Sequence, residues 1–251
     1  MLPRGFTLIP SHADGIEAVT ADSALAFGRH THGEFGIGLI ERGAQKSASG
    51  RGVVEAAAGD VITVNPGEVH DGTPLAAGGR RWRMLYISPT LVLDAADDIS
   101  PGAAFEFTAP VLRDAVLAAR FRALFDAATV GRRAWCAEAG LLELVAGLLR
   151  PATTRAAVHA GVAAARERMD DDPAADAGLS RYQFLRAFTR LTGLPPHAYR
   201  LQRRVQRARQ LVRGGLPLAD AAAASGFADQ SHMTRCFVRS YGLTPGACMR
   251  R

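Results

Sequence analysis

A short segment near the end of the sequence, GFADQSHMTRCFVRSYGLTPGACMR (Gly226–Arg250), has the pattern of a turn followed by an amphipathic helix. Gly226 supplies the turn, and Asp229 can cap a helix that begins near Gln230. Apolar side chains recur at a spacing of four and predict an inward face formed by Met233, Phe237 and Tyr241. The opposite, largely polar face carries Ser231, Thr234, Arg235 and Val238.

An alanine-rich helix is predicted directly before this segment, over Leu216–Ser225, with Pro217 in its first turn. Two helices joined by a glycine turn, the second with a cationic outer face, are typical of a helix-turn-helix. The second helix of that motif enters the major groove of DNA.

A looser copy of the pattern, GLSRYQFLRAFTRLTGLPPHAYR, occupies Gly178–Arg200. Ser180 begins a capping box, and Phe184 and Phe188 are predicted to face inward. Only Pro173–Ala177 is available before this copy to form the supporting helix, and that is too short. We therefore expect both phenylalanines to be partly uncovered and the first unit to be less stable than the second.

The two copies are joined by PPHAYRLQRRVQRARQLVRGG, residues 195–215, which predicts one long helix. Its apolar stripe is expected to consist of Ala198, Leu201, Val205, Ala208 and Leu211, with arginines coating the rest. Residues 152–251 contain 16 Arg against 7 acidic residues, a net charge of +9, whereas residues 1–151 have a net charge of −3. This concentration of positive charge favours a polyanion-binding domain, although a solvated basic surface has the same composition.

The first part of the chain has the spacing of β structure. From Ser23 to Ser88, short apolar runs alternate with turns that contain Gly and Pro, which favours a small β-barrel or sandwich. Strands are predicted within Glu34–Glu41, Gly59–His70 and Arg80–Ser88. The first of these strands places Phe35, Ile37 and Leu39 on one face.

Two amphipathic helices are predicted after Pro110, over Val111–Ala128 and Trp135–Arg150, before Pro151 breaks the pattern. Their apolar faces need a partner, which is either the barrel of the same chain or a second chain. The sequence leaves both alternatives open.

The composition also bears on location. No apolar run is long enough to span a membrane, and the N-terminal segment lacks the features of a signal peptide. Three scattered cysteines, Cys136, Cys236 and Cys248, indicate reduced thiols and neither a disulfide framework nor a zinc site. We expect a cytoplasmic protein with no membrane partner.

Residues 158–251 resemble the DNA-binding domain of the AraC/XylS family of bacterial transcription regulators. GFADQSHMTRCFVRSYGLTP is close to the signature of that family, and GLSRYQFLRAFTRLTGLPPHAYRLQRRVQRAR is a good match. The resemblance implies that base contacts, or contacts near bases, come from Gln230, Ser231 and Arg235, with His232 and Thr234 beside them, and from Tyr182, Leu185 and Arg186 in the first unit. Arginine suits guanine and glutamine suits adenine. Arg190 and Arg239 lie one turn later and are expected to contact phosphate.

Four side chains that can bind a metal ion occur in the segments RHTHGEFGIGLIERG and NPGEVHDG. They are His30, His32, Glu34 and His70. On a small β-barrel such a set binds Fe, Mn or Zn, so a metal-dependent cupin enzyme with a degenerate DNA-binding tail is the alternative function. The segment Ala24–Ile87 resembles a cupin. Through GLIERGAQ, AGDV and NPGEVHDG it is more similar to the sensory cupin of AraC-type regulators, which implies a small organic effector without a metal.

The spacing also separates this segment from cupin enzymes, because Glu34 follows His32 after one residue and not after three or four. We therefore expect no metal and no other cofactor. The same four side chains, His30, His32, Glu34 and His70, are predicted to line an effector pocket at the mouth of the barrel. Arg42, Trp82 and Tyr86 are weaker candidates, the two aromatic residues being more typical of a core.

The sequence thus predicts an α+β protein with an N-terminal cupin-like β-barrel, a helical connector and a C-terminal all-α tandem helix-turn-helix domain. We predict a cupin-like barrel domain over 1–109, a helical connector that is a candidate for dimerisation over 110–151, and a DNA-binding domain with two helix-turn-helix units over 152–251. The predicted function is that of an effector-controlled transcription regulator, an activator or a repressor, and not of an enzyme. It is expected to bind a double-stranded promoter site as a homodimer in the bacterial nucleoid, with RNA polymerase as a further candidate partner.

We predict that the protein binds duplex DNA with a strong salt dependence, because each arginine that neutralises a phosphate releases a counterion. With six to ten phosphate contacts, affinity should fall by roughly 10³- to 10⁵-fold between about 50 and 200 mM salt. Fluorescence anisotropy of a labelled duplex measures this slope. A flat salt response, or no binding at low salt, contradicts the prediction.

Overall fold

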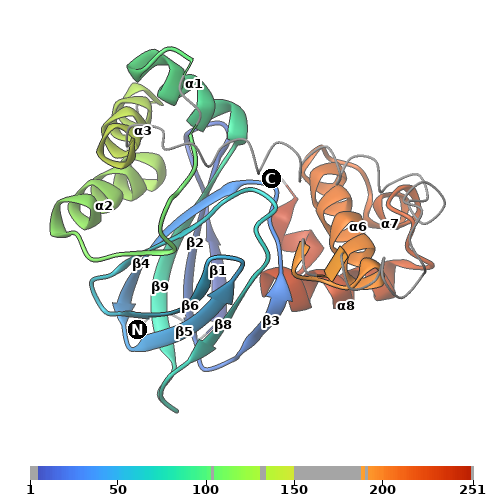
Figure 1. Cartoon of the computed structure of the whole chain (residues 1–251). Helices are drawn as coiled ribbons and strands as arrows, with labels where there is room; N and C mark the ends of the chain where they lie inside the picture. Colours follow the sequence, from blue (N-terminus) through green and yellow to red (C-terminus); the bar gives the residue numbers. More distant parts are fainter. Residues whose placement is uncertain (1–4, 103–104, 131–133, 150–187, 190–191, 250–251) are drawn as a thin grey trace.

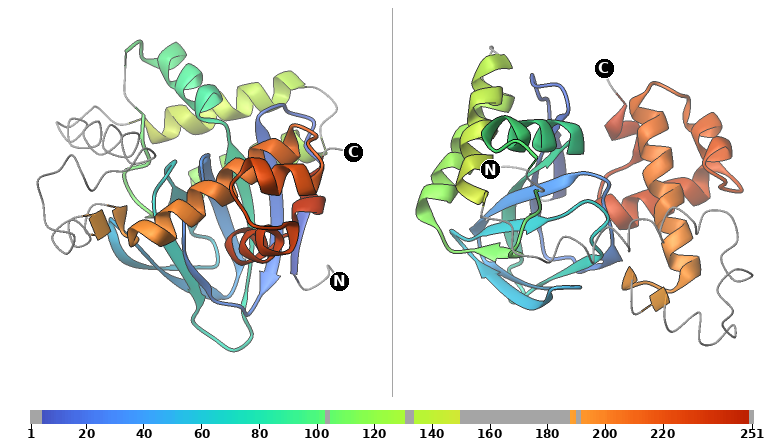
Figure 2. Two further views of the ribbon diagram at one scale, coloured as in Figure 1. Left: turned by 90° about the vertical axis from the view of Figure 1, so that its right-hand side faces the viewer. Right: turned by 45° about the horizontal axis from the view of Figure 1, so that its top comes forward.

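The structure is a computed structural model that describes residues 5–102, 105–130, 134–149, 188–189 and 192–249. A β-barrel of antiparallel strands lies between two groups of helices, as the views in Figures 1 and 2 show. The strands are β1 (Gly5–Ile9), β2 (Ile16–Ser23), β3 (Phe27–His30), β4 (Phe35–Arg42), β5 (Ala44–Ser49), β6 (Gly52–Ala57), β7 (Val61–Val64), β8 (His70–Pro74), β9 (Arg80–Ile87) and β10 (Val111–Leu112). The predicted fold class is confirmed.

The barrel consists of two sheets. The larger has the strand order β1-β2-β9-β4-β7-β10 and the smaller the order β3-β8-β5-β6, and the neighbouring strands are antiparallel. The three predicted strands correspond to β4, β7 and β9. Strands β1 and β2 precede the region in which the sequence indicated β structure. Strand β2 begins with four buried residues, Ile16–Val19, because both of its faces are covered, and this removes the alternation that reveals a half-buried strand.

The larger sheet is packed on both faces. Phe35, Ile37 and Leu39 of β4 share one face, as predicted, and this face contacts the helices. Between them, Gly36 and Gly38 face the barrel interior, where a Cβ atom on either residue would lie within 2.7 Å of the Met84 side chain. The glycines therefore let that side chain lie directly against the strand.

Helices α1 (Pro89–Ile99), α2 (Ala115–Thr129) and α3 (Ala134–Leu148) cover the outer face of this sheet (Figure 1). Helix α2 begins at Ala115 and not at Val111 as predicted, because the Asp114 carboxylate accepts hydrogen bonds from the Val116 and Leu117 amides. The two residues before this cap, Val111–Leu112, form β10 and pair with β7. Helix α1 was not predicted.

The apolar faces of α2 and α3 pack within the chain. Phe121 and Leu124 of α2 and Leu144 of α3 are almost fully buried, and they belong to the same core cluster as Ile37 and Leu85 of the sheet. Fully burying a side chain of this size contributes about 1.5–3 kcal/mol. The sequence left two partners open for these faces, the barrel of the same chain and a second chain, and the structure shows packing against the barrel.

The second helix group consists of α6 (Pro196–Arg213), α7 (Leu218–Ala224), α8 (Gln230–Tyr241) and the 3₁₀ helix η2 (Pro245–Cys248). Helices α7 and α8 form the predicted helix-turn-helix, with Gly226 at a φ of 76° in the turn. Asp229 caps α8 by accepting a hydrogen bond from the His232 amide at 2.6 Å. Pro217 occupies the cap position of α7 and not its first turn.

Phe188 is buried and not partly uncovered as expected. It packs with Leu194 and Tyr199 and with Val69, which belongs to the barrel. The barrel therefore supplies the cover that the sequence did not reveal. Phe184 and Pro173–Ala177, the segment that the sequence indicated to be too short for a supporting helix, lie outside the described part of the chain.

Arg209 on α6 is also not where the sequence placed it. The exposed arginines of α6, Arg200, Arg203, Arg204 and Arg207, do coat its surface, but Arg209 is only 3% exposed. Its guanidinium donates to the Glu17 carboxylate at 2.6 Å and to the Glu34 carboxylate at 2.7 Å. Both glutamates belong to the barrel domain, so a buried ion-pair cluster joins the two helix-bearing halves of the molecule. The helical periodicity could not predict that Arg209 is buried, because a charged side chain is expected to be exposed.

We predict that Arg209→Ala lowers the free energy of unfolding by about 3–5 kcal/mol, because two carboxylates lose their partner in a buried position. The matched control is Arg42→Ala. Arg42 donates to Asp22 at 2.8 Å, but its side chain is 55% exposed, so the loss should be about 0–1 kcal/mol. Urea unfolding of both variants tests the difference, and equal losses would show that the cluster does not stabilise the interface.

Candidate functional site

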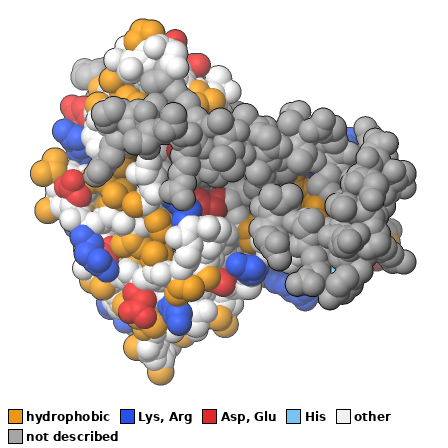
Figure 3. Space-filling model, in the orientation of Figure 1, with side chains coloured by type: hydrophobic (Ala, Val, Ile, Leu, Met, Phe, Trp, Pro, Cys, Tyr) orange, Lys and Arg blue, Asp and Glu red, His pale blue; other side chains and the backbone are white. Residues whose placement is uncertain are grey.

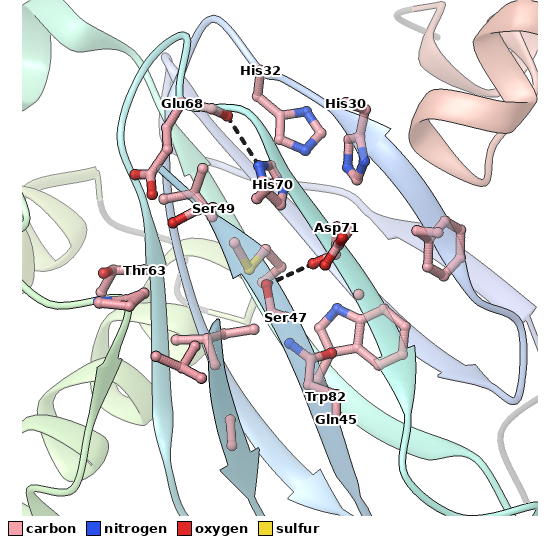
Figure 4. A pocket seen from close by; sticks show the side chains of 18 of the residues that line it. His30, His32, Gln45, Ser47, Ser49, Thr63, Glu68, His70, Asp71 and Trp82 are labelled. Carbon is pink, nitrogen blue, oxygen red and sulfur yellow. Dashed lines mark hydrogen bonds between the residues drawn. The ribbon is translucent and has the colours of Figure 1, made fainter. Parts of the chain in front are cut away.

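A pocket of about 90 Å³ lies between the two sheets of the barrel, which is several times the space that one water molecule needs. Alternate residues of two strands point into it, as the two-residue period of a strand requires. These residues are Gln45, Ser47 and Ser49 from β5, and Arg80, Trp82, Met84 and Tyr86 from β9. Figure 4 shows Gln45, Ser47, Ser49 and Trp82 among the lining side chains.

Three histidines lie together at one end of this pocket (Figure 4). The ring centroids of His30 and His70 are 4.4 Å apart, and the ring of His32 lies 4.9 Å from His30 and 5.1 Å from His70. One ligand nitrogen of each ring lies within 4.8 Å of the other two. The structure thus brings together three of the four side chains that the sequence proposed for an effector pocket.

The backbone fixes the tautomer of two of these rings. His30 Nδ1 lies 2.7 Å from the Gly28 carbonyl oxygen, and His70 Nδ1 lies 3.1 Å from the Glu68 carbonyl oxygen. A carbonyl only accepts, so Nδ1 donates in both rings and Nε2 keeps its lone pair. His32 Nδ1 is buried and makes no hydrogen bond within the described residues.

The three imidazoles are neutral at neutral pH. Burial, and then the neighbouring His70, lowers the pKa of His30 to about 3. Burial lowers the pKa of His70 to about 4. The pKa of His32 is held well below its usual range by burial and by the positive charges that His30, His70 and Arg209 would place near it.

Arg80 lies at the other end of the pocket and is 1% exposed. Its guanidinium donates to the Gln45 side chain at 2.6 Å and to the carbonyl oxygens of Leu25 and Gly72, and it lies 4.5 Å from the centre of the Trp82 ring. Burial lowers the pKa of Arg80 to about 10, so the group stays charged at neutral pH. No sequence pattern selects Arg80, because a lone arginine at the start of a strand carries no signal.

Glu34 does not line the pocket, since its carboxylate binds Arg209. Among the weaker candidates, Trp82 and Tyr86 do line the pocket, whereas Arg42 lies outside and binds Asp22. The fourth side chain of the predicted set is therefore part of the junction between the domains.

The pocket wall is completed by the end of α8, which supplies Ser240 and Tyr241. The ring of Tyr241 lies 5.4 Å from that of His32. The buried guanidinium of Arg209 lies between two tyrosine rings, 4.7 Å from the centre of Tyr241 and 5.6 Å from that of Tyr86. No sequence pattern predicted the contact between Tyr241 and His32, because these residues are distant in the chain and meet only when the domains pack.

The face of α8 on which the sequence placed DNA contacts is largely exposed. Gln230, Ser231, Arg235 and Arg239 are exposed, while His232 and Thr234 are partly buried. The ring of His232 packs edge-on against Phe227 at 5.4 Å, which gives it a structural role at the turn. The corresponding residues of the first unit, Tyr182, Leu185, Arg186 and Arg190, lie outside the described residues.

The barrel surface differs from this helical face. On the side shown in Figure 3, acidic and basic side chains of the barrel are interspersed with apolar ones. A DNA duplex would therefore meet positively charged helices on the helical domain and a surface of mixed charge on the barrel. The fold and these two sites together define a regulator with a ligand-binding barrel and a DNA-binding helical domain.

Comparison with known proteins gives the same division. The model of the AraC-like ligand binding domain matches residues 15–145, and that of a helix-turn-helix domain matches residues 174–251. The chain belongs to the AraC/XylS family of transcription regulators, and it is a DNA-binding regulator with an effector-binding domain. None of the described helices is both long and apolar enough to cross a membrane.

Two curated relatives are transcription regulators. The chain is 28% identical over 223 residues to YbfI of Bacillus subtilis (strain 168), described as an uncharacterized HTH-type transcriptional regulator, and the match covers 82% of this chain and 81% of that protein. It is 37% identical over 68 residues to the probable transcriptional regulator LumQ of Photobacterium leiognathi, covering 27% of each.

Solved structures of ToxT from Vibrio cholerae share the fold. A ToxT structure from strain O395 matches with a TM-score of 0.57 at 11% identity, over 96% of both chains. A ToxT structure with a bound unsaturated fatty acid matches with a TM-score of 0.57 at 11% identity, over 98% of this chain and 95% of that one. At this identity the likeness concerns the fold alone.

We predict that Arg235→Ala weakens binding to a specific site by roughly 1–3 kcal/mol and relaxes the preference at one base pair, because arginine makes a bidentate contact with guanine. Arg239→Ala is the matched control. It lies one turn later on the same helix, and its loss should weaken binding to all sequences alike.

Selection of bound sequences from a random duplex pool, followed by affinity measurement, distinguishes these outcomes. If the preferred site of Arg235→Ala equals that of the unmodified protein at every position, α8 does not enter the major groove as assigned.

Proposed function

We propose that a small effector binds in the barrel pocket and controls DNA binding by direct contact with the end of α8. The observation that carries this proposal is the composition of the pocket wall, which joins histidines of the barrel to Ser240 and Tyr241 of the DNA-reading helix. The effector would then contact the last turn of α8, a helix of 12 residues whose exposed face is predicted to contact DNA.

A ligand shifts an equilibrium only by its differential affinity for the two states. In the described arrangement an effector touches both domains, so it has more contacts when α8 lies against the barrel than when α8 moves away. The ion pairs of Arg209 with Glu17 and Glu34 hold the same arrangement. Effector binding therefore stabilises the orientation in which α8 lies against the barrel. If DNA binds this orientation, the effector raises DNA affinity, and if DNA binds another orientation, the effector lowers it.

The lining suggests the kind of effector. One end of the pocket contains the three histidines with Ser47 and Ser49. The other end combines the apolar side chains Phe27, Trp82 and Met84 with Arg80, whose guanidinium is engaged by Gln45 and by two backbone carbonyls. This pattern suits a small molecule with an apolar body and a polar group at one end. ToxT has been solved with an unsaturated fatty acid bound, which is a molecule of that general type.

We further propose that the protein is not an enzyme. The carboxylate that a metal-dependent cupin enzyme would need beside the histidines is that of Glu34, and this group is bound to Arg209 outside the pocket. Homodimer formation, contact with RNA polymerase and a place in the bacterial cytoplasm, at the nucleoid, stay predictions. So do the base contacts of both helix-turn-helix units and the domain boundaries given above.

The proposal is tested by the reciprocity of the two binding events. In Trp135→Phe, Trp82 is the one remaining tryptophan, and its fluorescence reports ligands in the pocket. A panel of small carboxylic acids, phenols and sugars is screened in this way, and the affinity of each ligand that binds is measured again with saturating duplex. We expect DNA to change that affinity by about 5- to 150-fold, in either direction.

In Tyr241→Ala this factor should fall to nearly one, because the contact between ligand and α8 is lost. Val238→Ala is the matched control, since Val238 is on the same helix but exposed and outside the pocket. If DNA changes the ligand affinity of Tyr241→Ala as much as that of the unmodified protein, the contact between ligand and α8 is not what couples the two binding events.

A further inference from the structure

We propose that His30, His32 and His70 form a binding site for one divalent transition metal ion of the zinc class, with a coordination position left open to an anionic ligand in the pocket. This reverses the expectation from spacing, which counted Glu34 as a ligand and found the pattern unsuitable. The structure instead selects three imidazoles without the carboxylate.

The positions of the nitrogen atoms suit one ion. In a tetrahedral zinc site with bonds of about 2.0–2.1 Å, ligand nitrogens lie about 3.3 Å apart. The three candidate nitrogens already lie within 4.8 Å of one another, so side-chain movements of about 1 Å bring them to bonding distance. The barrel thus holds the three rings nearly in place before an ion binds.

The surroundings prepare the rings for this role. His30 and His70 donate through Nδ1 to backbone carbonyls, which orients each ring and leaves Nε2 free to bind, as in most protein metal sites. His32 is 2% exposed, and its Nδ1 is buried without a hydrogen-bond partner in the described residues. A buried polar atom left in this state is unfavourable, and a ligand that engages the ring relieves it.

The charge of the site indicates what completes it. Within the described residues the cluster itself contains no carboxylate and no thiolate, and imidazole is a neutral ligand, so none of the three ligands would offset the charge of a bound divalent ion. Three protein ligands also leave one tetrahedral position to a water or a ligand. An anionic donor atom, such as a carboxylate oxygen, meets both needs.

This inference deepens the proposed function, and its second half rests on it, because the effector would bind partly through the metal. The polar end of the effector is then an anionic, metal-binding group, and the apolar side chains around Trp82 contact its body. The ion itself would lie close to Tyr241, whose ring is 5.4 Å from that of His32. Metal binding alone requires neither effector nor DNA, so it is tested separately.

The test uses full-length protein without a polyhistidine tag, titrated with Co²⁺ and followed by visible absorption, with competition by Zn²⁺. We expect one equivalent of Co²⁺ per chain, displaced by one equivalent of Zn²⁺. In His32→Ala and in His70→Ala the affinity should fall by about 100-fold or more. His12→Ala and His197→Ala are the matched controls, since both histidines are exposed and outside the cluster, and their titrations should be unchanged.

Each variant is first compared with the unmodified protein by thermal unfolding and by DNA binding. If His32→Ala fails to fold, His70→Gln answers the question, because the His70 ring is only partly buried and glutamine fills a similar space. Absence of stoichiometric Co²⁺ binding, or binding that survives in His70→Gln, overturns the site.

Azide then probes the open position. Added to the Co²⁺-loaded protein, it should shift the visible spectrum, whereas an unchanged spectrum means that no position is open to an anion and overturns the second half of the inference. Failure of the coupling measured with Tyr241→Ala would leave both spectroscopic results intact. The metal site and the proposed regulation can therefore fail independently.

Discussion

The arrangement of the molecule depends on one buried charge. The Arg209 guanidinium lies between the barrel and the helical domain, bound to Glu17 and Glu34 and placed between the rings of Tyr86 and Tyr241. Removing a guanidinium from water is costly, and two carboxylates at hydrogen-bonding distance compensate it only while the domains stay together. A non-directional apolar interface would tolerate sliding, but this cluster specifies one orientation.

Smaller contacts extend the same interface. Arg29 of the barrel donates to the Gly193 carbonyl at 2.9 Å, and Gln206 of α6 donates to the Thr31 carbonyl at 3.2 Å. Val69 covers Phe188, so part of the first helix-turn-helix unit uses the barrel as its support. The effector-binding half is in this way a structural component of the DNA-binding half, which gives a ligand in the barrel a physical means of acting on DNA affinity.

Next to this interface lies the pocket, and its two ends have different characters. Near Arg80 and Trp82 the side chains are fixed by hydrogen bonds and by stacking, so this end has a defined shape. Near the junction, three histidines hold one ligand nitrogen each within 4.8 Å of the others. Polar groups with free lone pairs, held in a buried place beside the contact between the two domains, are suited to bind a ligand that touches both domains.

The sequence by itself determined the local elements. Caps, glycine turns and a spacing of four fixed the α7–α8 unit, because Asp229 and Gly226 act on their immediate neighbours. Alternation fixed β4, because one face of that strand is uniformly apolar. The tertiary structure alone decided the burial of Arg209, the cover of Phe188, the exclusion of Glu34 from the pocket and the meeting of the three histidines. Each of these depends on residues far apart in the chain, and periodicity records only which face of its own element a side chain occupies.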